Sequence, residues 1–213
     1  MSDLPTWLQP LAAKARDIDA SDLSRFPPPV DGSGRQSAVL MAFAETSDGP
    51  GILLIERAAD LRKHPGQVAF PGGSLDPGET PAHAALREAD EEVGLNARSV
   101  HVVAELPAIY IPVSGFVVTP VLAWWEQPHE VSAVDAGEVA LVALIPVAEL
   151  ANPANRFTVT HPTGYVGPAF EAGGLFVWGF TAGLVDRLLT FGGWAQPWDQ
   201  TLRRPLPPAL MGR

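Results

Sequence analysis

Hydrophobic residues along the chain fall into short runs that are separated by turn-forming segments. Two of these runs, residues 37–45 and 51–57, flank a Thr-Ser-Asp-Gly-Pro stretch, which is the pattern of a β-hairpin. Residues 61–78 hold many turn formers and predict a long loop. Other apolar runs have the length of single β-strands, and they predict strands over residues 99–106, 116–126, 139–145 and 156–161.

One segment has the spacing of an amphipathic helix. Thr80 is a suitable N-cap, and Pro81 is tolerated at the first helical position. Gly94 is suited to end the helix in a left-handed conformation. These signals predict a helix over residues 80–93, and its apolar face consists of residues three and four positions apart, namely Ala82, Ala85, Leu86, Ala89 and Val93.

The second half of the chain predicts one more long helix. It covers residues 180–191, with Thr181 as a plausible N-cap and Gly192-Gly193 as the stop. Residues 146–150 predict a single helical turn. Because strands and helices mix without a regular alternation, we expect an α/β or α+β fold in which helices cover a mixed sheet.

Composition and charge narrow the possible functions. The chain has 213 residues and no Cys, which excludes a disulfide framework, a thiolate nucleophile and a zinc-thiolate site. A formal net charge of −10 argues against a protein that binds nucleic acid through its overall field. Residues 1–20 lack the pattern of a signal peptide, and no apolar run is long enough to span a membrane. We therefore expect a cytoplasmic protein that binds a small molecule.

The polar face of the helix over residues 80–93 gathers negative charge. Glu88, Glu91 and Glu92 are three and four positions apart, so their carboxylates share one stripe. Like charges at this spacing cost about 0.2–0.5 kcal/mol per pair in an isolated helix. A hard divalent cation would offset that cost, because Mg²⁺ prefers oxygen ligands. The alternative interpretation is an acidic face that is simply solvated.

The residues around these carboxylates resemble the Nudix box. The box is a spaced pattern, and every position it specifies is filled here: Gly73, five residues, Glu79, seven residues, Arg87-Glu88-Ala89, one residue, Glu91-Glu92, one residue and Gly94-Leu95. The resemblance implies an α/β/α sandwich with a mixed central sheet. It also implies hydrolysis of a nucleoside diphosphate that is linked to another moiety.

The resemblance assigns roles to particular residues. Glu88, Glu91 and Glu92 would hold Mg²⁺ or Mn²⁺, and the backbone carbonyl of Gly72 would add a ligand. Arg87 is also expected to contribute to catalysis. It would form an ion pair with Glu79 that fixes the loop to the helix. The general base is either Glu91 or Glu138, which precedes the strand predicted over residues 139–145. Glu138 can also be interpreted as a surface carboxylate.

The segment before the box bears on the substrate. It resembles the coenzyme A pyrophosphatase branch of the Nudix family, except that Ile55 stands where the branch has Thr. Arg57 and Arg62 would bind phosphates beside Gly72 and Gly73, since Arg suits bidentate phosphate contacts. The matching residues are Leu53-Leu54-Ile55-Glu56-Arg57-Ala58, Arg62, Gly66 and Phe70-Pro71-Gly72-Gly73.

These features lead to one principal hypothesis and two alternatives. The principal hypothesis is a hydrolase that splits coenzyme A, or acyl-coenzyme A, into 3′,5′-ADP and 4′-phosphopantetheine. The alternatives are a Nudix hydrolase of ADP-ribose, a dinucleotide or a damaged nucleotide, and an inactive nucleotide sensor. We expect an N-terminal extension at residues 1–36, the Nudix domain at 37–193 and an irregular Pro-rich tail at 194–213. Homodimers are expected from the family resemblance.

Overall fold

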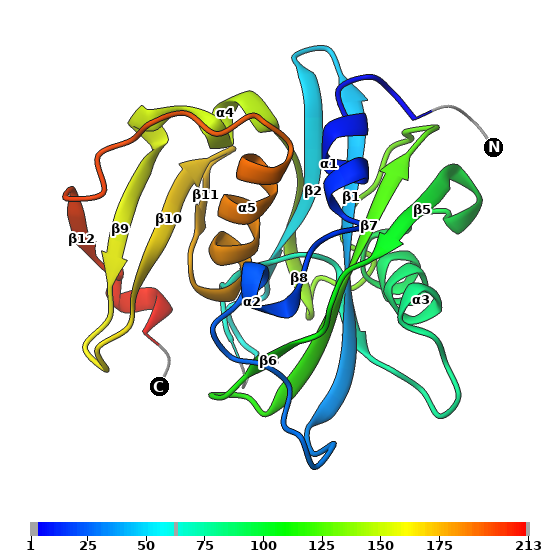
Figure 1. The fold of residues 1–213 in the computed structure, drawn as a ribbon, viewed down its shortest axis with the longest axis horizontal. Helices are drawn as coiled ribbons and strands as arrows, with labels where there is room; N and C mark the ends of the chain where they lie inside the picture. The colour runs from blue at the N-terminus through cyan, green and yellow to red at the C-terminus, as the bar shows by residue number, and fades with distance from the viewer. Residues whose placement is uncertain (1–3, 62–63, 212–213) are drawn as a thin grey trace.

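The first strand of the predicted hairpin runs through the middle of a large mixed sheet (Figure 1). In the computed structural model, which describes residues 4–61 and 64–211, this strand is β1 (Arg35–Thr46). It pairs antiparallel with β2 (Gly49–Arg57), so the hairpin is confirmed. On its other side it pairs in parallel with β7 (Phe116–Trp125). The parallel pair makes the sheet mixed, as predicted.

Shorter strands extend the large sheet. The segment 61–78, which was predicted as a loop, contains β3 (Val68–Ala69) and β4 (Gly72–Ser74), which pair with β2 and β1. The loop prediction is wrong for these residues, because strands of two or three residues are too short to show periodicity. The strands predicted over residues 99–106 and 139–145 are confirmed as β5 (Val100–Glu105) and β8 (Val139–Pro146). A further short strand, β6 (Ile109–Ile111), pairs with β7.

Helices cover both faces of the large sheet. Leu40 of β1 is buried among side chains of α3 (Pro81–Val93), which is the predicted carboxylate helix. The next residue, Met41, points to the opposite face and is buried among side chains of α1 (Gln9–Lys14) and α5 (Gly179–Phe191). This alternation along one strand is why β1 is apolar on both faces. The result is an α+β fold with a mixed central sheet.

A second, smaller sheet stands beside the first. Its order is β11-β10-β9-β12, and α5 packs against it (Figure 1). The predicted strand over residues 156–161 is confirmed as β9. The tail was expected to be irregular, but part of it pairs in parallel with β9 as β12, so that expectation is wrong there. The strands are β9 (Arg156–Thr160), β10 (Val166–Ala172), β11 (Leu175–Val177) and β12 (Arg203–Pro205).

The start of α5 differs from the prediction. The helix begins at Gly179, and Trp178 occupies the N-cap position. Thr181 is therefore not the N-cap; it lies in the first turn and is buried. Its hydroxyl donates a 2.9 Å hydrogen bond to the carbonyl oxygen of Val68, which joins α5 to β3. Other short helical segments are α2 (Ala20–Leu23), α4 (Val147–Ala151), η1 (Ala97–Ser99), η2 (Pro153–Asn155) and η3 (Pro208–Leu210).

The N-terminal segment packs on the large sheet. Leu8 and Leu11 are fully buried in the same cluster as Met41, and the indole of Trp7 donates a hydrogen bond to Glu45 of β1. The boundaries that were expected after residues 36 and 193 stay predictions. Within the part of the chain that the structure describes, none of the helices combines the length and the apolar character needed to cross a membrane.

Candidate active site

The carboxylate helix begins and ends as its sequence predicts. The hydroxyl of Thr80 accepts a hydrogen bond from the amide of His83, and Gly94 ends α3 with a φ of 72°. A further partner comes from β5, where Glu105 Oε1 accepts a 3.0 Å hydrogen bond from the amide of Ala82. A carboxylate at this end of a helix is stabilised by the helix dipole. Sequence reasoning missed Glu105, because no local pattern connects it to α3.

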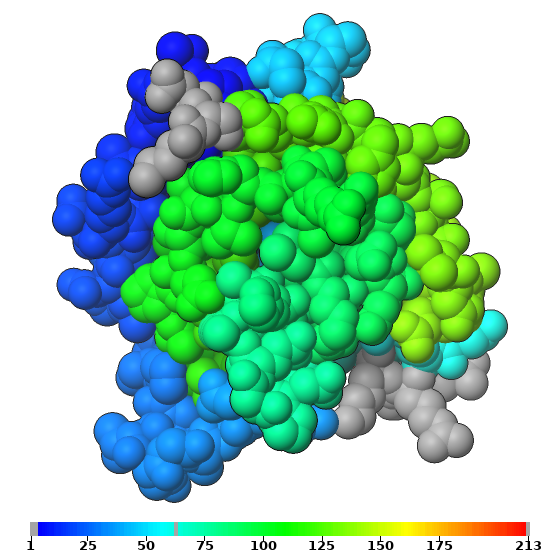
Figure 2. Space-filling model, turned by 90° about the vertical axis from the view of Figure 1, so that its right-hand side faces the viewer, coloured from blue at the N-terminus to red at the C-terminus, as the bar shows by residue number. Residues whose placement is uncertain are grey.

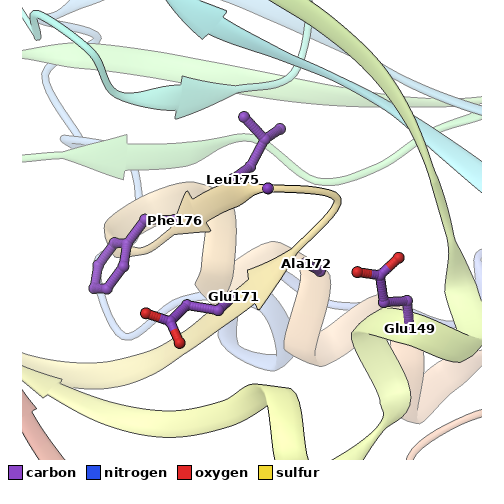
Figure 3. A pocket seen from close by; sticks show the side chains of 6 residues that line it. Glu149, Glu171, Ala172, Leu175 and Phe176 are labelled. Carbon is purple, nitrogen blue, oxygen red and sulfur yellow. The ribbon is translucent and has the colours of Figure 1, made fainter.

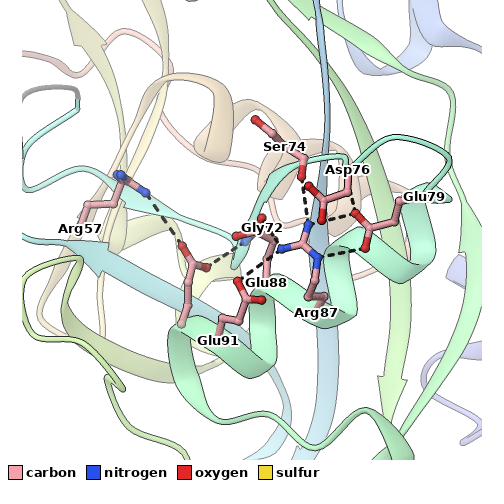
Figure 4. A network of polar contacts seen from close by, with 9 residues as sticks. Arg57, Gly72, Ser74, Asp76, Glu79, Arg87, Glu88 and Glu91 are labelled. Atoms are coloured by element: carbon pink, nitrogen blue, oxygen red, sulfur yellow. Dashed lines mark hydrogen bonds and ion pairs between the residues drawn. The ribbon is translucent and has the colours of Figure 1, made fainter.

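Arg87 ties this helix to the loop before it (Figure 4). Its Nε and Nη2 each donate a 3.0 Å hydrogen bond to the carboxylate of Glu79, and Nη2 also donates to the carbonyl of Ser74 at 3.1 Å. The Arg87 hydrogen bonds, together with the amide of Asp76, lower the pKa of Glu79 to about 2. The structure thus contains the ion pair between Arg87 and Glu79 that the resemblance implied.

Glu92 is the buried carboxylate of the site. Its side chain is 7% exposed, and its Oε2 accepts a 3.0 Å hydrogen bond from the amide of Gly72. Burial raises the pKa of Glu92 to about 7, and the negative charges of Glu88 and Glu138 act in the same direction. The Gly72 amide and Arg57, whose Nη1 lies 4.0 Å from Glu92 Oε1, oppose this shift. Three carboxylates therefore act on one another here.

Glu88 and Glu91 lie on the Arg87 side of the helix (Figure 4). Arg87 Nη1 is 2.9 Å from Glu88 Oε1 and 3.3 Å from Glu91 Oε2. The Glu91 side chain is 61% exposed, whereas that of Glu88 is 20% exposed. Glu88 also packs against Gly73, because a Cβ at that position would lie 2.4 Å from the Glu88 carboxylate carbon. Only glycine leaves room for the Glu88 carboxylate there.

Glycine is required at the preceding position, Gly72, for a different reason. A Cβ on Gly72 would lie 2.3 Å from the carbonyl oxygen of Ala38 in β1. The absence of a side chain therefore allows β4 to pair with β1 in register, with Gly72 opposite Val39. This pairing directs the Gly72 amide at Glu92. The Gly72-Gly73 pair is consequently what brings the signature loop close to α3.

The donor set of the site suits a hard divalent cation. The acidic side chains on this part of α3, Glu88, Glu91 and Glu92, offer carboxylate oxygens, which Mg²⁺ and Mn²⁺ prefer. A cation would also stabilise the charged form of Glu92, which burial, and then the charges of Glu88 and Glu138, disfavour by raising its pKa. Among residues 4–61 and 64–211, no three His, Asp or Glu side chains already surround one point as metal ligands. Here Glu88 and Glu91 face Arg87, while Glu92 faces Gly72.

Arg57 ends β2, and Glu138 lies in the turn directly before the neighbouring strand β8. The carbonyl oxygen of Glu138 accepts a 2.9 Å hydrogen bond from the amide of Ala58, and Arg57 is opposite Val139 in the β2–β8 register. Arg57 Nε is buried and has no hydrogen-bond partner among the described residues. Arg62, the other predicted phosphate contact, lies outside the described residues. The structure thus brings together the predicted residues Arg57, Gly72, Gly73, Arg87, Glu88, Glu91, Glu92 and Glu138.

A separate hollow of about 360 Å³ lies between α4 and the β10–β11 hairpin (Figure 3). Both of its carboxylates already have partners. Glu149 accepts a 2.7 Å hydrogen bond from the amide of Gly173, and Glu171 forms a 2.7 Å ion pair with Arg204. None of the residues that line this hollow belongs to α3. It is therefore distinct from the carboxylate site.

Known proteins resemble this chain over most of its length. Residues 34–163 match the NUDIX domain family. An uncharacterized Nudix hydrolase of Citrobacter koseri, NudL, is 40% identical over 78% of this chain and 90% of its own length. Nudix hydrolase 3 of Caenorhabditis elegans is 37% identical over 63% of this chain, but the match spans only 58% of that protein.

A solved structure supports the fold. The Nudix hydrolase RenU of M. smegmatis superposes with a TM-score of 0.51 and is 22% identical. The match covers 78% of this chain and 90% of RenU. At this identity the likeness concerns the arrangement of the elements alone.

Proposed function

The chain belongs to the Nudix family and is a Nudix hydrolase, and on that premise we propose that it is a metal-dependent pyrophosphohydrolase that cleaves coenzyme A and its acyl derivatives. The observation that carries the metal-dependent part is the buried Glu92, on which the negative charges of Glu88 and Glu138 act. A bound cation would offset this negative charge, and it would thereby reduce the electrostatic repulsion between the site and a pyrophosphate. The expected products are 3′,5′-ADP and 4′-phosphopantetheine, or its acylated form.

We assign the metal to oxygen ligands around the end of α3. Glu88, Glu91 and Glu92, with the carbonyl of Gly72, would hold Mg²⁺ or Mn²⁺. A bound ion of this kind neutralises pyrophosphate charge and lowers the pKa of a water molecule. Arg87 contributes by keeping the loop and the helix together through its hydrogen bonds to Glu79 and Ser74.

We propose Glu138, rather than Glu91, as the general base. Both carboxylates are exposed, but that of Glu91 is already paired with Arg87, whose Nη1 lies 3.3 Å away. Glu138 forms no ion pair within the described residues, and its negative charge helps to raise the pKa of Glu92 after the larger effect of burial. In the proposed reaction a water oxygen bonds to one phosphorus while the bridging P–O bond breaks, and Glu138 takes the proton of the water. The displaced phosphate leaves with the electron pair of the broken bond.

Arg57 supports a substrate with several phosphates. Its side chain is 30% exposed and its Nη1 lies 4.0 Å from Glu92 Oε1, so a ligand can reach part of the guanidinium beside the carboxylates. Coenzyme A carries a pyrophosphate and a 3′-phosphate, which suit Arg57 and Arg62. The departure from the branch motif lies elsewhere, since Ile55 is 1% exposed in the core against α3. Exchange of Thr for Ile there changes packing and not a substrate contact.

A substrate panel tests the proposal. Coenzyme A, acetyl-coenzyme A, ADP-ribose, a dinucleoside polyphosphate and an oxidised nucleoside triphosphate are each incubated with the protein and Mg²⁺ or Mn²⁺. Mass spectrometry of the products then identifies the broken bond. We expect 3′,5′-ADP from coenzyme A. Survival of coenzyme A while ADP-ribose is cleaved would overturn the substrate assignment and leave the metal site intact.

Two substitutions on α3 separate the metal site from a general effect of charge. Glu92→Gln removes the buried carboxylate, so we expect almost no turnover and weaker binding of Mn²⁺ measured by calorimetry. Asp90→Asn makes the same change of charge on the exposed face of the same helix and is the matched control. Normal turnover by Glu92→Gln would exclude the proposed metal site. Normal Mn²⁺ binding without turnover would mean that Glu92 acts in the reaction after the metal ion has bound. An inactive sensor would bind coenzyme A without cleaving it.

A further inference from the structure

The segment between β7 and β8 crosses the C-terminal end of α3 before it reaches Glu138. The amide of Ser132 donates a 3.2 Å hydrogen bond to the carbonyl of Val93, and the amide of Val134 donates a 3.0 Å hydrogen bond to the carbonyl of Glu92. Carbonyls in the last turn of a helix have no partner within the helix. Figure 2 shows the lime-green surface of this segment along one side of the teal α3. The segment is therefore fixed to the carboxylate helix by its backbone.

Asp135 closes the turn that presents Glu138. Its Oδ1 accepts a 2.7 Å hydrogen bond from the amide of Gly137. Its backbone carbonyl accepts 3.0 Å hydrogen bonds from the amides of Glu138 and Val139. An Asp side chain that bonds to the backbone two residues later is a common way to stabilise a turn. Three consecutive backbone amides are thus held by one residue.

The other side of Glu138 is held by β2. Its carbonyl accepts the hydrogen bond from Ala58, directly after Arg57. With its N–H bonded to Asp135 and its C=O bonded to Ala58, the Glu138 backbone has little freedom to rotate. The position from which its side chain starts, one residue before β8, is fixed by this restraint. Of the two restraints, only the turn includes a side-chain hydrogen bond, and that bond is made by Asp135.

We infer that Asp135 is a positioning residue for the reaction, acting through Glu138. This inference rests on the proposed function, in which Glu138 is the general base. A loosened turn lets the Glu138 carboxylate move away from the attacking water while Arg57 and the α3 carboxylates keep their places. Because small displacements of a reacting group reduce turnover strongly, loss of the Asp135 side chain should lower kcat about tenfold and leave KM nearly unchanged.

A double-mutant cycle tests the inference. Asp135→Ala removes the hydrogen bond to Gly137, whereas Asp135→Asn keeps an oxygen acceptor at the same place. We expect kcat to fall in the first variant and to stay near that of the wild type in the second. In a Glu138→Gln background, Asp135→Ala should cause no further fall, because the two residues act through one group.

A second readout follows the turn itself. Hydrogen exchange at the amide of Gly137 should speed up in Asp135→Ala and stay slow in Asp135→Asn. Asp31→Ala is the matched control, because Asp31 Oδ1 makes a similar 2.9 Å hydrogen bond to the amide of Ser33 in the loop before β1. This control should leave kcat unchanged.

The outcomes separate the two proposals. If Glu138→Gln loses turnover while Asp135→Ala keeps it, despite faster exchange at Gly137, the positioning role is overturned and the base assignment stands. An equal fall of kcat from Asp135→Ala in both backgrounds also overturns the positioning role, because Asp135 then acts independently of Glu138. Full turnover by Glu138→Gln overturns the base assignment and the positioning role with it.

Discussion

Arg87 and Glu79 are joined by two hydrogen bonds of 3.0 Å each, from Nε and Nη2 of the guanidinium to the two carboxylate oxygens. The same guanidinium reaches Ser74 and Glu88, so one side chain connects the loop, the helix and a proposed metal ligand. Lysine has one compact ammonium group and does not reproduce this planar fork.

Arg87→Lys should therefore destabilise the protein. We expect the free energy of unfolding to fall by about 1–2 kcal/mol, since several charge-assisted hydrogen bonds are lost or lengthened. Urea denaturation at neutral pH measures this change. Arg98→Lys, on the exposed segment after α3, is the control for the same chemical exchange. Equal stability of the Arg87 and Arg98 variants would contradict the prediction.

Glu79 should contribute a stability that depends on pH. Its pKa is lowered in the folded state from 4.5 to about 2, chiefly by the Arg87 hydrogen bonds. A carboxylate with a lowered pKa stabilises the fold fully above its ordinary pKa and loses that effect as the pH falls through the folded-state value. The difference in unfolding free energy between wild type and Glu79→Gln should thus be constant above pH 4.5 and shrink toward pH 2.

Urea titrations of the two proteins at a series of pH values measure this difference. Glu130→Gln, which removes an exposed carboxylate without an ion pair within the described residues, controls for the loss of one charge. A wild-type advantage that persisted unchanged down to pH 2 would sink this prediction.

Gly73→Ala should weaken metal binding without unfolding the protein. The added Cβ would meet the Glu88 carboxylate at 2.4 Å, so that carboxylate must turn away from the loop. Displaced ligands and their supports commonly cost about 10–100-fold in metal affinity. Calorimetric titration with Mn²⁺ measures the change, and circular dichroism reports the fold.

Gly183→Ala is the control for this substitution. Gly183 lies within α5, and a Cβ there would meet nothing within 4 Å. Alanine also favours a helix more than glycine does, so this variant should fold at least as well as the wild type. Unaltered Mn²⁺ affinity in Gly73→Ala would mean that Glu88 does not hold the ion.

Thr181→Val should destabilise the protein, because it removes the hydrogen bond that joins α5 to β3. The Thr181 hydroxyl is buried and donates to the Val68 carbonyl at 2.9 Å. Valine has nearly the same shape but leaves that carbonyl without its donor, which costs about 1–3 kcal/mol in a buried place. Thr181→Ser keeps the hydroxyl and should retain more of the stability. Thermal unfolding of the three proteins measures this, and a Val variant as stable as the wild type would disprove it.

Local sequence patterns predicted the carboxylate helix correctly. Thr80, Pro81 and Gly94 specify its ends through contacts within a few residues, and the glutamates lie on one stripe because of helical periodicity. The hairpin was predictable for the same reason, since its turn residues are contiguous. The helix carries three of the four proposed metal ligands, namely Glu88, Glu91 and Glu92.

Features that depend on distant parts of the chain were not predictable from local patterns. Strand β10 contains Gly167 and Pro168, which disfavour a strand, yet it pairs with both β9 and β11. The hydrogen bond of Thr181 reaches across 113 residues, and the capping carboxylate of Glu105 is 23 residues from its partner. Each of these arrangements is decided by tertiary packing, which outweighs local preference.

The parallel pairing of β1 with β7 means that the sheet under the site can be completed only after a long intervening segment has been synthesised. Arg35 lies opposite Phe116, and the whole signature loop and α3 are encoded between those two positions. Contacts between distant segments form late, because a long loop must close first. The proposed metal ligands of α3 therefore leave the ribosome before β7, the strand that completes the sheet beneath them. A nascent chain that stalls before Phe116 carries the complete signature without the β7 strand that supports it.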